Sequence, residues 1–217
     1  MPVLVKICGI TNVEDAVAAA RFGADFIGLN FYPRSSRCID ESQAHLVRHT
    51  LPPNVVPVAL FVNESWELIH QITGRLGIDT IQVHRDRPQL CPLIDRKWIH
   101  AVAVCDEATL TKDAFLLSWP SETLDPLAVL LDSYKAGAYG GTGKVAPWHA
   151  IADVCRKTPI GQSNIILAGG LTPDNVAEAI RIVRPWGVDV ASGVESSPGK
   201  KDHDKMRRFI ENTKAAG

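Results

Sequence analysis

The sequence predicts an α/β fold, a single (β/α)8 barrel (TIM barrel) that spans residues 1–217 as one domain. Short apolar runs alternate with segments of helical periodicity along the chain. Most runs are continuously apolar, which is typical of parallel strands buried on both faces. A Gly-x-Asp motif recurs at Gly23, Gly77 and Gly187, at intervals of 54 (77 − 23) and 110 (187 − 77) residues. These intervals fit two and four strand–helix units of about 27 residues, so the chain accommodates eight units.

We expect one strand in each unit. In chain order they are Val3–Cys8, Phe26–Phe31, Val55–Val62, Thr80–His84, Trp98–Val104, Leu127–Asp132, Asn164–Ala168 and Val188–Ala191. In the first strand, Val5 and Ile7 alternate with Lys6 and Cys8. Since the apolar side should meet the helices, we expect Lys6 and Cys8 to point into the barrel. A doubly wound open sheet is the competing architecture, but eight strands favour closure.

Two helix starts carry sequence signals. Thr11 followed by Glu14 is a capping box, and it precedes an apolar face of Val13, Ala16, Val17 and Ala20. Thr172-Pro173 predicts a second helix with proline in its first position, followed by a face of Val176, Ala179, Ile180 and Val183. The glycine of each Gly-x-Asp motif is expected to end a helix in a left-handed turn.

Composition excludes several classes of protein. Hydrophobic residues make up 46% and charged residues 22%, and the formal net charge is −1, so nothing favours non-specific nucleic-acid binding. No apolar run approaches the roughly 18 residues of a membrane span, and no secretory signal is visible. The five cysteines are widely spaced without a CxxC pair, which argues against a disulfide framework or a structural zinc site. We therefore expect a cytoplasmic enzyme.

Catalytic groups of such barrels lie at the carboxyl ends of the strands. Cys8 ends the first strand, and a Lys6 ammonium about 6.5–7 Å away would favour its thiolate, although an inert packing cysteine is an equal alternative. Lys6 fits better as an interior ion-pair residue, with Asp189 as a candidate partner. Asp132 ends the sixth run, where a carboxylate is costly to bury unless it is paired, hydrogen-bonded or protonated. In its protonated form the carboxyl group would be a general acid. Its alternative is a helix cap or loop-entry aspartate.

Binding groups are expected at other strand ends. Gly169–Gly170 and Ser192–Gly193 follow the seventh and eighth strands, where glycine amides and a helix N-terminus suit a phosphate. Arg37, in the loop after the second strand, could grip a carboxylate or be a solvated cation. His84 ends the fourth strand and could donate a hydrogen bond to a substrate.

A glycine-rich segment, Ala138–Lys144, follows Asp132. This composition is typical either of a mobile loop beside the Asp132 carboxyl group or of a surface turn. The segment lacks the spacing of a Walker loop. No His, Asp, Glu or Cys pair stands at metal-ligand spacing, so we predict no metal and no cofactor.

The strand-end residues belong to motifs that together resemble the phosphoribosylanthranilate isomerases of tryptophan biosynthesis. In order the motifs are Lys6–Thr11, Gly23–Gly28, Phe31–Arg37, Leu60–Asn63, Ile81–His84, Leu130–Ser133, Gly140–Gly143, Leu167–Leu171, Ser192–Glu195 and Pro198–Asp202. They cover nearly the whole chain.

This resemblance implies an Amadori rearrangement of N-(5-phosphoribosyl)anthranilate, an aminoaldose, to the corresponding 1-deoxyribulose. It implies that Asp132 protonates the ribose ring oxygen and that Cys8 removes the proton from ribose C2. Arg37 would bind the anthranilate carboxylate, and the Gly169–Gly170 and Ser192–Gly193 backbones the phosphate. The only expected partner is this small-molecule substrate, and the sequence leaves a monomer and a homodimer open.

Three segments depart from the family pattern: Arg85-Asp86 after the histidine, Lys144–Trp148, and the stretch from Cys105 to Pro126. Two other functions are alternatives to this one. Another phosphate-binding barrel isomerase or epimerase would be expected to carry an aspartate in place of Cys8, or inward metal ligands. A non-catalytic phosphosugar-binding barrel would not need both Cys8 and Asp132.

Overall fold

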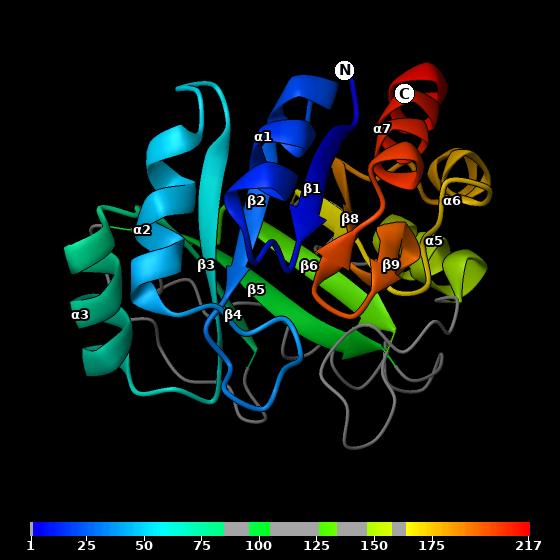
Figure 1. Ribbon diagram of the computed structural model, residues 1–217. Helices are drawn as coiled ribbons and strands as arrows, with labels where there is room; N and C mark the ends of the chain where they lie inside the picture. Colours follow the sequence, from blue (N-terminus) through cyan, green and yellow to red (C-terminus); the bar gives the residue numbers. More distant parts are fainter. Residues whose placement is uncertain (1, 85–95, 105–125, 134–146, 158–163) are drawn as a thin grey trace.

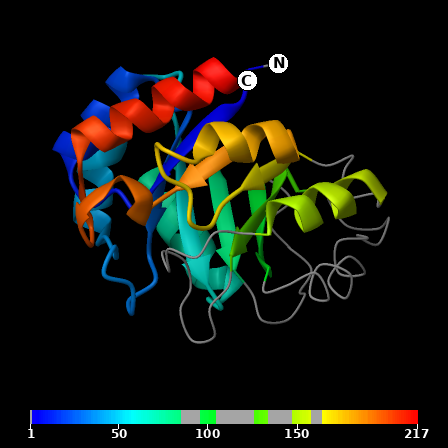
Figure 2. The ribbon, with the colours of Figure 1, turned by 90° about the vertical axis from the view of Figure 1, so that its right-hand side faces the viewer.

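The computed structural model describes residues 2–84, 96–104, 126–133, 147–157 and 164–217. In this part of the chain, eight parallel strands follow one another around a closed barrel, and β1 pairs with β8 to complete it. Helices cover the outside of the barrel (Figures 1 and 2). The predicted barrel is therefore confirmed.

The barrel strands lie where the apolar runs predict them. They are β1 (Leu4–Cys8), β2 (Phe26–Asn30), β3 (Val56–Val62), β4 (Thr80–His84), β5 (Lys97–Val104), β6 (Ala128–Ser133), β7 (Ile165–Leu167) and β8 (Gly187–Val190). Each bound lies within about one residue of the predicted one, because continuous apolar runs of this length are buried on both faces.

The helices of the described residues are α1 (Val13–Phe22), α2 (Glu41–Thr50), α3 (Trp66–Leu76), α5 (Trp148–Lys157), α6 (Val176–Val183) and α7 (His203–Ala216). A 3-10 turn, η2 (Ser192–Val194), follows β8 and leads into a small antiparallel hairpin of β9 (Glu195–Ser197) and β10 (Lys200–Lys201). The sequence did not predict this hairpin. Among the described helices, none is both long and apolar enough to span a membrane.

The start of α1 differs from the predicted capping box by one position. Asn12 is the N-cap, and its side-chain oxygen accepts a hydrogen bond of 2.8 Å from the backbone N–H of Asp15. The Asn12 amide in turn donates to the Asp15 carboxylate at 2.9 Å. The Thr11 hydroxyl, which the sequence predicts as the cap, instead donates to the carbonyl of Gly199 at 2.6 Å. Gly199 lies in the hairpin between β9 and β10.

The start of α6 also differs from the prediction. Asn175 precedes the first helical residue, and its side-chain oxygen accepts a hydrogen bond from the Thr172 backbone N–H at 2.8 Å. The Thr172-Pro173 dipeptide therefore lies in a turn before the helix and is not its first turn. The predicted apolar face is confirmed, since these four side chains are buried: Val176, Ala179, Ile180 and Val183.

Two of the three Gly-x-Asp motifs end a helix as predicted. Gly23 (φ +101°) and Gly77 (φ +61°) are left-handed caps of α1 and α3. Gly187 is different, because it is the first residue of β8. The preceding helix ends at Arg184, which itself adopts the left-handed conformation (φ +53°). The expected helix-ending role of Gly187 is therefore wrong.

The two faces of the strands pack into different clusters. Val5 and Ile7 belong to the large cluster shared with the helices, to which Ala16 of α1 also belongs. A second cluster belongs to the barrel interior: Phe26, Val58, Ile99, Ala101, Ala128, Leu130, Ile166 and Ala168. Cys8 packs in a third cluster with Leu60 and Val62, at the carboxyl ends of their strands. The predicted inward direction of Cys8 is confirmed.

Candidate active site

A pocket opens at the carboxyl ends of the barrel strands. Every residue predicted for the site lines it: Cys8, Arg37, His84, Asp132, Gly169, Gly170, Ser192 and Gly193. The fold therefore brings together residues from six strand ends.

Cys8 lies beside a buried ion pair. The Lys6 ammonium donates to the Asp189 carboxylate at 2.7 Å, as expected, and Lys6 is only 1% exposed. Burial raises the pKa of the Cys8 thiol; the Lys6 charge opposes this and the Asp189 charge reinforces it. The thiol is therefore the resting form at neutral pH. The expected effect of Lys6 is confirmed in direction, since its charge lowers the pKa of Cys8, but desolvation outweighs one cation that is already paired.

Two further candidates stand at or near the ends of other strands. Asp132 near the end of β6 and His84 at the end of β4 both line the pocket. Burial, with smaller contributions from the Lys6 and His100 charges, lowers the pKa of His84 to about 3. The imidazole is thus neutral at physiological pH, and its Nε2 lies 2.9 Å from the side-chain amide of Gln82. A neutral imidazole of this kind is a hydrogen-bonding group and not a fixed charge.

Arg37 reaches the pocket from the loop after β2. Its Nε and Nη2 donate to the two carboxylate oxygens of Glu195 at 2.8 and 2.7 Å. The arginine is therefore held by a bidentate ion pair and is not a solvated cation. Since the pair uses only one edge of the guanidinium, the Nη1 amino group lies outside it.

The two glycine loops fit against each other. Gly169 (φ +88°) and Gly170 (φ +67°) are both left-handed, a conformation that side chains other than glycine rarely adopt. A Cβ built on Gly193 would lie 1.9 Å from the carbonyl oxygen of Leu171, so the loop after β8 contacts the loop after β7 directly. The Asn175 side chain donates to the Gly170 carbonyl at 3.0 Å and anchors this loop to the start of α6.

These loops have the features of an anion site. The first amides of a helix have no acceptor within it, and the helix dipole places positive potential there. Both loops lead into helical turns, α6 after Gly170 and η2 from Ser192. Their convergence on one side of the pocket supports the predicted phosphate position.

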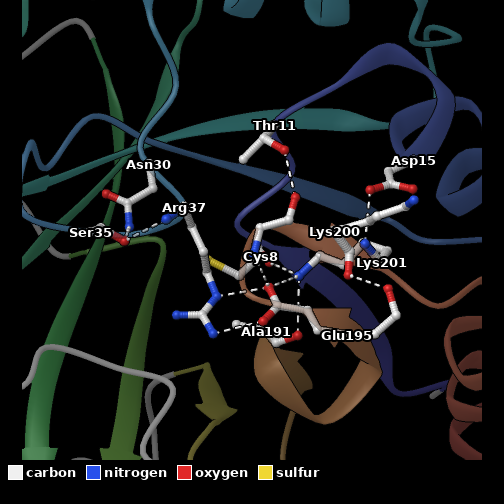
Figure 3. A network of polar contacts seen from close by, with 12 residues as sticks. Cys8, Thr11, Asp15, Asn30, Ser35, Arg37, Ala191, Glu195, Lys200 and Lys201 are labelled. Atoms are coloured by element: carbon white, nitrogen blue, oxygen red, sulfur yellow. Dashed lines mark hydrogen bonds and ion pairs between the residues drawn. The ribbon is translucent and has the colours of Figure 1, made fainter.

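Glu195 and Lys201 are functional candidates that the sequence reasoning missed. Glu195 accepts from Arg37 and from the Lys201 ammonium, the latter at 3.0 Å (Figure 3). Both residues stand in quoted motifs, Ser192–Glu195 and Pro198–Asp202. The sequence signal that could have identified Glu195 is its position as a charged residue just after the predicted phosphate loop Ser192–Gly193.

Some predicted features lie outside the described residues. These are the glycine-rich segment 138–144, Arg85-Asp86, and nearly all of the stretch from 105 to 126. Within the described ranges, no three His, Cys, Asp or Glu side chains are grouped closely enough to hold a metal ion.

Comparison with known proteins identifies the family. Residues 5–212 match the family model described as N-(5'-phosphoribosyl)anthranilate (PRA) isomerase. A relative of that name from Trichlorobacter lovleyi is 45% identical over 219 residues, covering 98% of each chain. The crystal structure of the phosphoribosyl anthranilate isomerase from Thermotoga maritima is 40% identical, with a TM-score of 0.85 over 98% of this chain and 99% of that one.

A third comparison concerns a liganded structure. A phosphoribosyl anthranilate isomerase in complex with reduced 1-(O-carboxyphenylamino)-1-deoxyribulose 5-phosphate is 38% identical, with a TM-score of 0.82 over 98% of this chain and 99% of that chain. Family model, relative and structures agree over nearly the whole length of the chain. The chain therefore belongs to the N-(5'-phosphoribosyl)anthranilate isomerase family.

Proposed function

We propose that this protein catalyses the Amadori rearrangement of N-(5-phosphoribosyl)anthranilate to 1-(2-carboxyphenylamino)-1-deoxyribulose 5-phosphate by general acid–base catalysis. The observation that carries the proposal is the pocket, which gathers a thiol, a carboxyl group, an arginine and two glycine loops. The family and the relative that binds a reduced product analogue support it. The rearrangement needs only proton transfers and an anchored substrate, and these side chains supply both.

Asp132 is the general acid in this proposal. It donates a proton to the ribose ring oxygen while the bond from that oxygen to C1 breaks. The lone pair of the anthranilate nitrogen forms the C1–N double bond of a protonated Schiff base. Asp132 and Cys8 both line the pocket and stand on β6 and β1, which are not adjacent in the barrel. The proposal accordingly assigns them different atoms of the substrate.

Cys8 is the general base. Its thiolate removes the proton from C2, and the electrons of that bond form the C1–C2 double bond as the nitrogen regains its lone pair. The resulting enolamine becomes the ketone when a proton leaves the C2 hydroxyl and a proton is added to C1. Because Cys8 rests as a thiol, its ionisation is a prerequisite of the second step.

The remaining residues bind the ends of the substrate. The Nη1 edge of Arg37 faces no part of Glu195 and suits the anthranilate carboxylate. The amides of the Gly169–Gly170 and Ser192–Gly193 loops suit the phosphate. His84 offers a neutral hydrogen bond from the wall of the pocket. The cytoplasmic location and the choice between monomer and homodimer stay predictions.

The test is a fluorescence assay on the purified protein. Phosphoribosylanthranilate is generated in place from anthranilate and phosphoribosyl pyrophosphate by a coupling enzyme, and loss of its fluorescence is followed. Cys8→Ala and Asp132→Asn should each lower kcat by about 10²- to 10⁴-fold, because proton transfer acts mainly in the transition state.

Cys155→Ala is the matched control, since it removes a partly buried thiol on α5 that does not line the pocket. Its kcat should equal that of the unmodified protein. Failure of the folded, unmodified protein to consume the substrate would refute the proposed activity. Full turnover in Cys8→Ala would leave the activity in place and remove the assigned base.

A further inference from the structure

Lys201 is a buried cation at the edge of the site. It lies on β10, and its side chain is 0% exposed. The ammonium donates to the Cys8 carbonyl at 2.7 Å, the Ala191 carbonyl at 3.1 Å and Glu195 Oε1 at 3.0 Å (Figure 3). A lysine ammonium has three N–H donors, so these contacts use all of them.

The three acceptors belong to three different parts of the site. Cys8 carries the proposed base, and Ala191 directly precedes the Ser192–Gly193 loop. Glu195 holds Arg37 through the bidentate pair. One ammonium therefore connects the proposed base, the proposed phosphate loop and the arginine proposed to bind the substrate carboxylate. These groups follow strands near the place where β1 pairs with β8 to close the barrel.

We propose that Lys201 is a positioning residue for the isomerisation, whose ammonium fixes the Cys8 main chain, the turn after β8 and, through Glu195, the Arg37 guanidinium relative to one another. This inference rests on the proposed function. Lys201 acts through these groups and needs no contact with the substrate.

The backbone of Lys201 is held separately from its side chain. Its N–H donates to the Asp15 carboxylate at 2.9 Å, and the neighbouring Gly199 carbonyl accepts from the Thr11 hydroxyl. These contacts tie the hairpin to α1 and to the loop after β1. A change confined to the Lys201 side chain should therefore leave the hairpin in place. Its effects on activity should then come from loss of the ammonium group.

The Lys201 charge also influences the ionisation of neighbouring groups in the site. Burial lowers the pKa of Lys201, and Glu195 opposes this. Burial by itself would raise the pKa of Glu195, but Arg37 and Lys201 together lower it. The Lys201 charge also lowers the pKa of Cys8 against the effect of burial. Loss of the ammonium should therefore disturb both geometry and the ionisation of the base.

The test replaces Lys201 by methionine, which keeps an unbranched stem and removes the donors. With phosphoribosylanthranilate as substrate, kcat/KM should fall by on the order of 100-fold, because displacements of about 1 Å at reacting groups have effects of that size. Both parameters should change: kcat falls through Cys8, and KM rises through Arg37.

The pH profile supplies a second readout. The charged groups that face Cys8 are Lys6 on the same strand, Asp189 on β8, Arg37 after β2 and Lys201 on β10. Only the last is altered in the variant. The rise of kcat/KM that accompanies Cys8 ionisation should therefore move to higher pH in Lys201→Met, because a cation that favours the thiolate is gone.

Two controls separate this role from simple stability. Lys200→Met makes the same change at the exposed neighbour on β10 and should leave kcat, KM and the pH profile unchanged. Ile210→Ala removes a buried side chain of α7 and should lower Tm without moving the pH profile.

Lys201→Arg keeps a positive charge and should recover part of the lost kcat and of the pH shift.

If Lys201→Met does not fold, Lys201→Gln, a neutral side chain with an N–H donor, replaces it with the same expected shift of the profile. The proposal is overturned if the neutral variant keeps kcat, KM and pH profile near those of the unmodified protein. It is also overturned if its losses merely match those of Ile210→Ala at an equal fall in Tm. An unmodified protein without isomerase activity would instead refute the proposed function.

Discussion

The Cys8 thiol lies between opposing influences. It is 6% exposed, and burial favours the neutral form. Lys6 favours the thiolate, but its ammonium is paired with Asp189, whose charge acts in the other direction. Reactivity at this residue is thus set by neighbours on two strands and not by the cysteine alone.

A pH dependence follows from this balance. The pKa of Cys8 is raised above 9.0, and the active form of a base is the deprotonated one. The value of kcat/KM should therefore rise with pH through neutrality and beyond pH 9.0. Steady-state kinetics across that range, with substrate generated in place, measures the rise.

Cys8→Asp provides the matched comparison, since the ordinary pKa of an aspartate is about 4. Burial raises the pKa of either group, but the carboxylate should still ionise at lower pH than the thiol, so the variant's residual activity should not show the same rise. If the rise persists at the same pH in Cys8→Asp, it belongs to another group, and Cys8 is not the titrating base.

At the scale of elements, the loops after β7 and β8 depend on glycine for their close approach. The Leu171 carbonyl occupies the space in which a side chain at position 193 would begin. Neither loop can move outward without displacing amides proposed to bind phosphate. The positions of the amides proposed to bind phosphate therefore depend on the contact between the two loops.

Gly193→Ala should separate these loops and weaken phosphate binding by roughly tenfold or more, because the added methyl group cannot share space with a backbone carbonyl. Competitive inhibition by inorganic phosphate measures the loss. Gly74→Ala is the control: a Cβ at Gly74, within α3, meets no atom within 4 Å.

In that control the substitution should stabilise the protein by about 0.5–1 kcal/mol through helix propensity and leave phosphate affinity unchanged. Equal phosphate affinity in Gly193→Ala and in the unmodified protein would show that the loop contact does not shape the anion site.

At the scale of the whole molecule, β1 and β8 meet to close the barrel. Lys6 lies opposite Asp189 in the register of these strands, and the two form a buried ion pair across the seam. Helix α7 packs over the same region and contacts both α1 and β1 (Figure 2). The first and last strands are thus joined by backbone pairing, by charge and by the last helix.

Lys6→Met should destabilise the protein by about 3–5 kcal/mol, because it leaves the Asp189 charge buried without its partner. Urea unfolding at neutral pH measures the change. Arg75→Met breaks an ion pair of the same 2.7 Å length at the surface, where the arginine side chain is 54% exposed. That variant should lose far less stability, because solvent screens an exposed pair. Similar losses in the two variants would contradict a special contribution of the seam.

The sequence predicted much of the candidate site because its residues stand next to strands. Cys8, His84 and Asp132 lie at strand ends, and once the strands are known the barrel brings their carboxyl ends to one face. The Glu195–Arg37 pair spans 158 positions, and the Lys201–Cys8 contact spans 193. Lys6 and Asp189, on the predicted first and last strands, could be paired in advance, but Glu195 and Lys201 stand in a hairpin that the apolar runs do not predict. These two contacts were therefore not predicted.

The sequence by itself determined the succession of eight strands, the inward face of β1 and the positions of the catalytic candidates, since apolar runs and alternation are local properties of the chain. Only the tertiary structure decided which residue caps α1, that Arg37 is paired with Glu195, and that Cys8 rests as a thiol. The physical reason is the same in each case. Caps, ion pairs and pKa values depend on competing partners and on burial, and both arise only when distant segments pack together.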